Sequence, residues 1–236
     1  MKNKLTCPTC GFDNDFYSRI CTSCKGYLRD RVVNIDLWSV ISLLIEIPTK
    51  AFRNIIQAEH KNFILFLLIA ISIKYLITAR LFAGHTLGNF TPSTNIFLSY
   101  LIILAAIILS FILFSLLVKF LLKNFEFSTR FKDNLAITIY SQVPLIFSLI
   151  ILFPLEIVIF GDYLFSTNPT PFQIKPALAY IFFIVEIIAF LWSTFLLFVS
   201  LYVSSKSKAI SILTTAIFIL LISTLVIYSS KIIFTL

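Results

Sequence analysis

Residues 95–118 read NIFLSYLIILAAIILSFILFSLLV, and this stretch decides the fold. Its middle part, residues 101–109, is apolar on every side and lacks the alternating pattern of a membrane β-barrel strand. A helix needs about 20 apolar residues to cross a bilayer. Four other segments meet this requirement, namely residues 62–81, 135–160, 177–203 and 209–234. The sequence therefore predicts an all-α polytopic membrane protein with five transmembrane helices.

Composition and charge agree with a membrane location. The chain has 236 residues, of which 59% are hydrophobic and 13% are charged, so beside the bundle it has room for only one small polar domain. Fifteen of the nineteen Lys and Arg residues lie in residues 1–61, in the loop 119–132 and in the loop 206–208. The positive-inside rule then predicts a cytoplasmic N-terminus and an external C-terminus. The net charge of +8 follows this loop pattern, so we expect no nucleic-acid partner.

Two CxxC pairs dominate the polar region 1–30. Cys7 and Cys10 form the first pair, and Cys21 and Cys24 form the second. This spacing is typical of a zinc ribbon that binds one Zn²⁺, and four thiolates leave no position for a catalytic water. A redox function is disfavoured because the pair is duplicated and no βαβ pattern surrounds it. We expect a structural zinc, and we expect the ribbon to fold only when it binds the metal.

The segment 12–17, FDNDFY, lies between the two pairs and mixes acidic with aromatic residues. It could be the surface that binds an unidentified protein partner, or its aromatic side chains could cap the small core of the ribbon. The sequence leaves both open. Residues 1–36 also lack the apolar region of a signal peptide, so we expect the first span to act as the insertion signal.

Residues 31–61 form the approach to the first span. Residues 35–47 are short for a span and carry one polar stripe, and Pro48 separates them from a second amphipathic segment. We expect two interfacial helices on the cytoplasmic leaflet, with Trp38 at the headgroup level. Basic residues such as Lys50 and Arg53 would favour anionic membrane lipids as partners. The transmembrane domain then comprises residues 62–236.

Four ionisable residues fall within or near the spans: Lys74, Arg80, Glu156 and Glu186. Because such charges are costly in hydrocarbon, they tend to pair or to face a cavity. A rise of about 1.5 Å per residue places Glu186 at the depth of Arg80, and within reach of Lys74 if the lysine side chain extends outward. The same arithmetic places Glu156 at the interface. We predict an ion pair between spans one and four, with a proton or ion relay as the alternative.

Pro144 and Pro154 both lie in the third span, which should therefore be kinked or broken. Broken helices line substrate sites in some transporters. Gly84 and Gly88 have GxxxG spacing, but we expect them in an external loop, residues 82–92.

Several short segments resemble the Yip domain, a five-span membrane family with a cytoplasmic N-terminus. The approach IPTKAFRNI at 47–55 is similar to the pattern before the first span of prokaryotic members, and YSQVPL at 140–145 resembles the Tyr-Ser and Pro element of span three. LWS at 191–193 is also similar. The resemblance extends from about Leu43 to the C-terminus and implies a prokaryotic-type Yip protein of the plasma membrane with an added zinc ribbon.

Eukaryotic members of that family associate with Rab-type GTPases in membrane trafficking. Their Asp-Leu-Tyr-Gly-Pro element has no match here beyond Asp36 and Leu37, and Ile139 replaces the glycine before the Tyr-Ser element. The resemblance therefore supports the fold and does not extend to that role.

The sequence favours a non-enzymatic membrane scaffold or adaptor. The two histidines, His60 and His85, are expected on opposite sides of the membrane, so they cannot share a metal site or serve one catalytic triad. The alternative is a small transporter or permeation protein that uses the kinked span three and Glu186. A homo-oligomer remains open.

Overall fold

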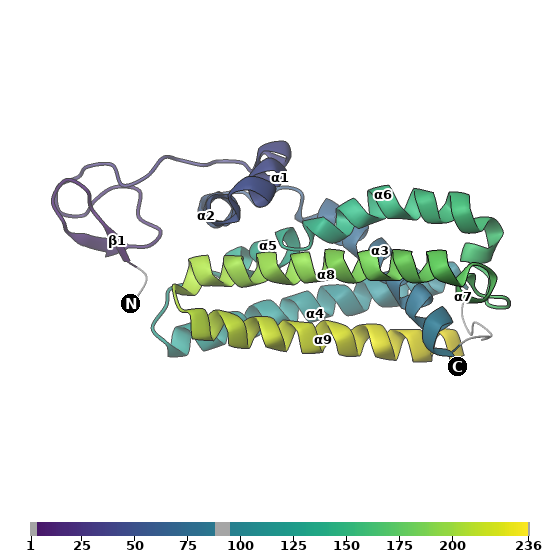
Figure 1. The fold of residues 1–236 in the computed structure, drawn as a ribbon. Coiled ribbons are helices and arrows are strands. Elements are labelled where there is room, and N and C mark those ends of the chain that lie inside the picture. Colours follow the sequence, from purple (N-terminus) through teal and green to yellow (C-terminus); the bar gives the residue numbers. More distant parts are fainter. Residues whose placement is uncertain (1–3, 88–94, 236) are drawn as a thin grey trace.

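The structure is a computed structural model that describes residues 4–87 and 95–235, without the side chains of 232–235. Figure 1 shows an elongated helical bundle with a small cysteine-containing unit at one end. Five helical segments of the described chain are long and apolar enough to cross a membrane. Their helices are α3 (Ile64–Leu87), α4 (Ile96–Asn124), α5 (Phe131–Tyr140) with α6 (Val143–Phe160), α8 (Pro176–Ser205) and α9 (Lys208–Thr235). The predicted fold class is confirmed.

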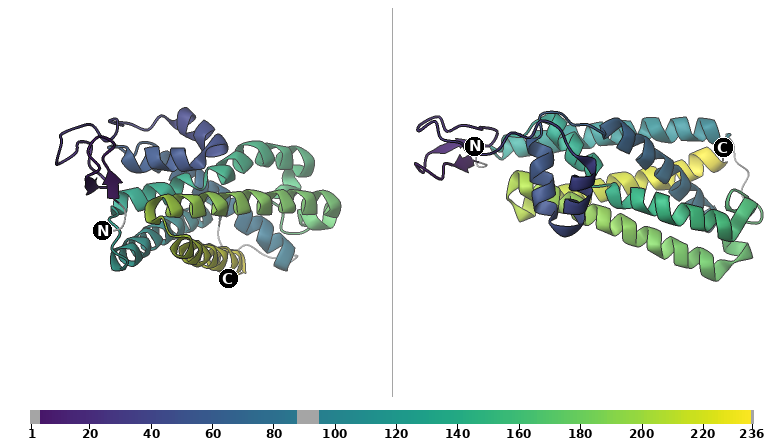
Figure 2. Two further views of the ribbon diagram at one scale, coloured as in Figure 1. Left: turned by 60° about the vertical axis from the view of Figure 1, so that its left-hand side comes forward. Right: turned by 90° about the horizontal axis from the view of Figure 1, so that it is seen from above.

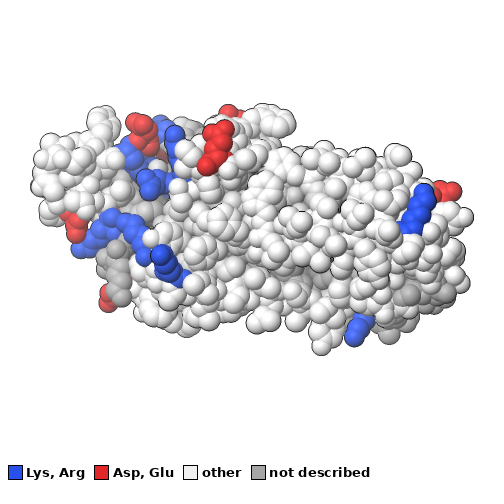
Figure 3. All heavy atoms as spheres, in the orientation of Figure 1, with Lys and Arg blue, Asp and Glu red and all other residues white. Residues whose placement is uncertain are grey.

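The surface of the bundle matches this assignment. On the face drawn in Figure 3, charged side chains gather at the two ends of the molecule, and the long middle part shows almost none. Many large apolar side chains of the spans are exposed, including Ile150, Val158, Ile188 and Leu220. A helix forms its backbone hydrogen bonds internally, so it can lie in lipid when its outward side chains are apolar.

Helix α3 extends beyond residue 81, where the sequence predicted its end. Helix α3 continues to Leu87, so Gly84 lies inside the helix and not in an external loop. A Cβ atom at Gly84 would lie 3.8 Å from Thr170, so the small residue lets the loop before α7 (Pro171–Ile174) approach α3 closely. Gly88 falls outside the described residues.

The third span is divided into two helices. Helix α5 ends at Tyr140, and α6 begins at Val143 after a turn formed by Ser141 and Gln142. Pro144 lies in the first turn of α6, where its missing N–H costs no helical hydrogen bond. Pro154 lies within α6, which continues to Phe160 and is followed by the 3-10 helix η1 (Gly161–Leu164).

The spans pack as neighbours in space and not simply in chain order. Helices α8 and α9 form an antiparallel hairpin, and α3 packs against α4, α6 and α9. Helix α6 packs against α8, while α5 packs against α4. Figure 2 shows that α3 crosses the bundle obliquely. This tilt decides which polar side chains of α3 can meet α8.

Two short helices cover the end of the bundle near the cysteine unit. They are α1 (Leu37–Glu46), which Asp36 caps, and α2 (Pro48–Gln57), which starts at the predicted proline. Ala51, Phe52 and Ile55 of α2 are buried, and α2 packs against α5 and α8. Protein therefore covers the apolar face that was expected to lie on the lipid leaflet. Trp38 of α1 remains 78% exposed.

The first 30 residues form the cysteine unit. Strands β1 (Lys4–Thr6) and β2 (Asp13–Asp15) pair antiparallel, with Leu5 opposite Asn14. A second antiparallel bridge joins Ile20 to Tyr27. The unit has little hydrogen-bonded structure and few buried side chains for a core of its own.

Candidate metal centre and intramembrane charge cluster

The four cysteine sulfurs converge on one point. All four Sγ atoms lie within 4.8 Å of one another. The Cys7 and Cys24 sulfurs are 3.6 Å apart, as are the Cys10 and Cys21 sulfurs. A tetrahedral metal with metal–sulfur bonds of about 2.3 Å requires sulfurs about 3.8 Å apart. The donor set and the spacing therefore fit one tetrahedral metal ion held by four thiolates.

Two equivalent backbone turns present these sulfurs. In the first, the N–H of Gly11 donates to the carbonyl of Cys7 at 2.9 Å, and in the second, the N–H of Lys25 donates to the carbonyl of Cys21 at 3.1 Å. Gly11 adopts a left-handed φ of 70°, as expected for a glycine after a CxxC pair. In the second turn, Lys25 takes that conformation with φ 60°. Gly26 instead leaves space, because a Cβ there would lie 3.3 Å from the Cys24 sulfur.

Asn14 supports the centre from β2, and sequence reasoning missed it. Its side chain is buried, and its Nδ2 donates to the carbonyl of Phe12 at 2.9 Å and to the Cys21 sulfur at 3.5 Å. Its Oδ1 accepts from the backbone N–H of Thr22 at 2.8 Å. The amide thus fixes the second turn relative to the first, as groups around a metal ligand commonly do.

The pKa values of thiols at this centre differ because of their hydrogen bonds and their neighbours. The backbone N–H of Cys24, followed by the Asn14 amide, lowers the pKa of Cys21 to about 6. Backbone hydrogen bonding from Cys10 lowers the pKa of Cys7. For Cys24, the Gly26 N–H favours the thiolate, but the neighbouring Cys10 and Cys7 sulfurs outweigh it and raise the pKa to about 12. Four adjacent thiolates need a cation, so metal binding must release protons.

Tyr17 docks the cysteine unit onto the bundle. Its hydroxyl accepts a hydrogen bond from the backbone N–H of Arg130 at 3.2 Å, and the Arg130 guanidinium lies 4.0 Å from the centre of its ring. Arg29 donates to the Tyr17 carbonyl at 2.9 Å. Burial, followed by the charge of the nearby Asp133, raises the pKa of Tyr17. Phe16 is also buried, so the aromatic end of segment 12–17 faces inward.

Glu59 holds the chain that follows the cysteine unit. Its carboxylate accepts from Arg19 at 2.9 Å and from Arg31 at 3.0 and 3.1 Å, and its N–H donates to the Val32 carbonyl at 3.0 Å. The hydrogen bond from Arg31 lowers the pKa of Glu59. These links join the cysteine unit to the end of α2.

A buried ion pair lies beneath this junction. The Lys61 ammonium is 2.9 Å from a carboxylate oxygen of Asp133, at the start of α5, and both side chains are nearly buried. The ammonium also donates to carbonyls at the C-terminal end of α2, at 3.0 Å for Ile56 and 2.8 Å for Ala58. Burial lowers the pKa of Lys61, and the Asp133 charge opposes this shift. Lys61 therefore joins α2 to the third span.

The outer side of the cysteine unit remains exposed. Tyr27 is 83% exposed, and Ile20, its partner in the β-bridge, is 50% exposed. Phe12 of the same unit is also 50% exposed. Large apolar side chains on a small polar unit commonly mark contact surfaces. Within segment 12–17, Phe16 and Tyr17 are thus packed against other parts of the protein, while Phe12 is exposed.

Within the spans, the structure joins Lys74 of α3 to Glu186 of α8. The Lys74 ammonium contacts the Glu186 carboxylate, and Ser148 of α6 donates to the second Glu186 oxygen at 3.3 Å. Lys74 is 0% exposed. Arg80 instead donates to the Phe165 carbonyl, and its guanidinium lies 5.9 Å from the Phe165 ring centre. Depth arithmetic favoured Arg80 as a direct partner because it treated tilted helices as upright.

Glu156, which the depth arithmetic placed near the membrane interface, is buried inside the protein. Its side chain is 0% exposed within α6. Neither carboxylate oxygen has a hydrogen-bond partner among the described residues, and the group interacts electrostatically with both Lys74 and Glu186. The sequence identified the residue, but only the packing of α6 against α3 and α8 brings it to the pair.

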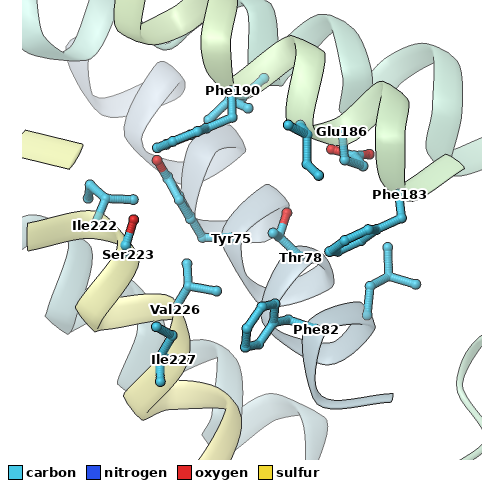
Figure 4. A pocket seen from close by; sticks show the side chains of 13 residues that line it. Tyr75, Thr78, Phe82, Phe183, Glu186, Phe190, Ile222, Ser223, Val226 and Ile227 are labelled. Atoms are coloured by element: carbon cyan, nitrogen blue, oxygen red, sulfur yellow. The ribbon is translucent and has the colours of Figure 1, made fainter. Parts of the chain in front are cut away.

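A pocket of about 320 Å³ lies beside this cluster, between α3, α8 and α9 (Figure 4). Its lining is mostly apolar, with Phe183 and Phe190 on the α8 side. Glu186, Tyr75 and Thr78 supply polar atoms, so the ion pair borders a space within the membrane-spanning region.

These features define a polytopic helical membrane protein with a four-cysteine unit fixed to one end of its bundle. The family model of the Yip1 domain matches residues 42–228, and the chain therefore belongs to the Yip1 domain family. The match begins within α1 and ends within α9, so the cysteine unit precedes it. No curated protein and no solved structure matched the chain. The family resemblance expected from the sequence is confirmed.

Proposed function

We propose that this protein is a membrane adaptor whose cysteine unit is a ribbon with one structural Zn²⁺ and binds a protein partner through its outer face. The observation that carries the proposal is the docking of the unit. Tyr17 and Arg130 fix one side of it to the bundle, while Ile20 and Tyr27 of the same unit remain exposed. A rigidly held, partly apolar surface loses little freedom when it binds, which favours a protein interface.

Zinc is the metal that the donor set favours. Four thiolates at tetrahedral spacing are typical of structural zinc, and they leave no open position for catalysis. The family assignment is consistent with a non-enzymatic role. The metal would stabilise the turns at Gly11 and Lys25 and so maintain the exposed face.

We place the ribbon in the cytoplasm of a prokaryotic cell, with the C-terminus outside the plasma membrane. The Lys and Arg distribution along the chain supports this orientation, and Figure 3 shows basic side chains concentrated at the ribbon end. A reducing compartment also keeps the cysteines available for metal. Exposed Trp38, with Lys50 and Arg53, would meet the headgroups of anionic lipids.

Crosslinking and mass spectrometry in native membranes would test the adaptor. The wild type is compared with the Cys21→Ser, Cys24→Ser double variant, with Tyr27→Ala and with the control Asp30→Ala, all at equal abundance. We expect one specific partner that disappears in the double variant and weakens in Tyr27→Ala, but persists in Asp30→Ala. An identical partner profile in all four proteins would refute the adaptor.

A small transporter or permeation protein is a second candidate, and the pocket beside Glu186 favours it. The divided third span lies next to this pocket, since Leu145 of α6 contributes to its lining. A flux through proteoliposomes that fails in Glu186→Gln and survives loss of the ribbon cysteines would establish this function. Equal flux in wild type and Glu186→Gln would exclude Glu186 from it.

A further inference from the structure

We propose that Glu156, together with the Lys74–Glu186 pair, forms an intramembrane proton-binding site that holds one proton on the Glu156 carboxyl group. The site combines three side chains from three helices, α6, α3 and α8. It goes beyond the adaptor function and does not require that anything crosses the membrane.

The charges in this cluster do not balance without an added cation. Two carboxyl groups, Glu156 and Glu186, interact electrostatically with one ammonium, Lys74. Lys74 contacts Glu186, so Glu156 is the group left over. Removing an ionised carboxylate from water without a partner costs far more than the stability of a protein allows. The cluster is electrically neutral when Glu156 carries one proton.

The other charged groups near α6 do not supply this cation. Arg80 of α3 donates to the Phe165 carbonyl, and Lys175, which precedes α8, donates to the Ile159 carbonyl at 2.8 Å. Asp162 of η1 is exposed at the end of the bundle and is itself acidic. The electrostatic partners of Glu156 are Lys74 and Glu186.

The geometry favours a proton over a metal cation. Hard metal cations require six or more oxygen ligands or several bound waters. Here Lys74 and Ser148 already occupy the Glu186 oxygens, so the two Glu156 oxygens are the carboxylate oxygens of this cluster without a hydrogen-bond partner in the described part of the chain. A proton needs just one of them.

The pocket gives this site its route of exchange. Glu186 borders the pocket of about 320 Å³, while Glu156 is buried and does not line it. When the proton leaves Glu156, the new carboxylate competes with Glu186 for Lys74. The lysine then links α3 to α6 as well as to α8, so proton binding selects between two arrangements of the same three helices.

Infrared difference spectroscopy on the full chain in lipid vesicles at neutral pH tests the proposal. Protonated carboxyl groups have a carbonyl stretch that carboxylates lack, and labelling glutamate with ¹³C at the carboxyl carbon separates it from aspartate. The wild type should show one protonated glutamate. Glu156→Gln should show none, because Lys74 keeps Glu186 ionised. Glu186→Gln should also show none, because Lys74 then pairs with Glu156.

Lys74→Met provides the opposite change, since both glutamates then lack a cation and the protonated signal should double. Glu126→Gln, at an exposed position, is the matched control and should keep the wild-type signal. A wild-type protein without any protonated glutamate would overturn the proposal, as would a signal that survives in Glu156→Gln. A signal lost in Glu156→Gln but kept in Glu186→Gln would show that the three groups do not share a site. The two glutamine variants decide the matter even if Lys74→Met fails to fold.

Discussion

Replacing Lys61 with Met should destabilise the junction between α2 and the third span far more than an ordinary surface substitution. The Lys61 ammonium lies 2.9 Å from Asp133, and the two side chains are only 8% and 6% exposed. Methionine keeps the apolar length of the side chain but removes the charge and the hydrogen bonds to the Ile56 and Ala58 carbonyls. Removing one member of a buried ion pair costs about 3–5 kcal/mol, largely because the other charge is left unpaired.

A double-mutant cycle separates the ion pair from the packing. Adding Asp133→Asn to Lys61→Met removes the unpaired charge, so we expect the double variant to recover about 2 kcal/mol of the loss. Lys50→Met, at an exposed position of α2, is the control and should stay within about 0.5 kcal/mol of the wild type.

The measurement is the free energy of unfolding in mixed micelles titrated with a denaturing detergent and followed by circular dichroism. A loss below about 1 kcal/mol for Lys61→Met would show that water or lipid headgroups already screen the pair. Strict additivity in the cycle would show that Lys61 and Asp133 do not interact. Either result would refute the proposed role of Lys61 in the junction.

Three further predictions concern the ribbon. Cys10→Ser should reduce bound zinc to below one equivalent and unfold the ribbon, seen as rapid proteolysis of residues 4–30; an intact ribbon with full zinc would contradict the structural role. Apparent zinc affinity should rise with pH through the neutral range, because the pKa of Cys24 near 12 means that a proton must leave before the metal binds; competition with a chelator measures this, and a flat profile would count against it. Arg130→Gln should release Tyr17 and speed hydrogen exchange at residues 13–17 without loss of zinc, whereas unchanged exchange would show that the stacked guanidinium contributes nothing.

Features that depend on local sequence could be predicted. The length of the apolar segments alone located all five spans. A segment in lipid must form its backbone hydrogen bonds within itself, so it becomes a helix whatever its neighbours are. Pro48 and Pro144 marked breaks between helical segments, and a new helix begins with each of them in its first turn, where proline fits. The spacing of the cysteines likewise fixed their convergence, because two residues between thiols form one tight turn.

Features that depend on how helices tilt and rotate could not be predicted. Rise per residue gave a depth for Glu156, but it could not show that the rotation of α6 buries this side chain in the protein. The sequence left Arg80 and Lys74 as alternative partners of Glu186, and the packing of α3 against its neighbours decides for Lys74. Tyr17 and Arg130 are more than a hundred residues apart, and nothing local in either segment indicates their contact.

The division of the third span at Ser141 and Gln142 lets its two halves be held by different parts of the protein. Its first half, α5, is fastened by Asp133 to Lys61, and its Tyr140 hydroxyl donates to the Asn62 carbonyl at 2.7 Å. Its second half, α6, carries Glu156. A force on the ribbon would therefore act first on α5, through Tyr17 and Arg130, and the turn at 141–142 separates α5 from the helix that carries Glu156.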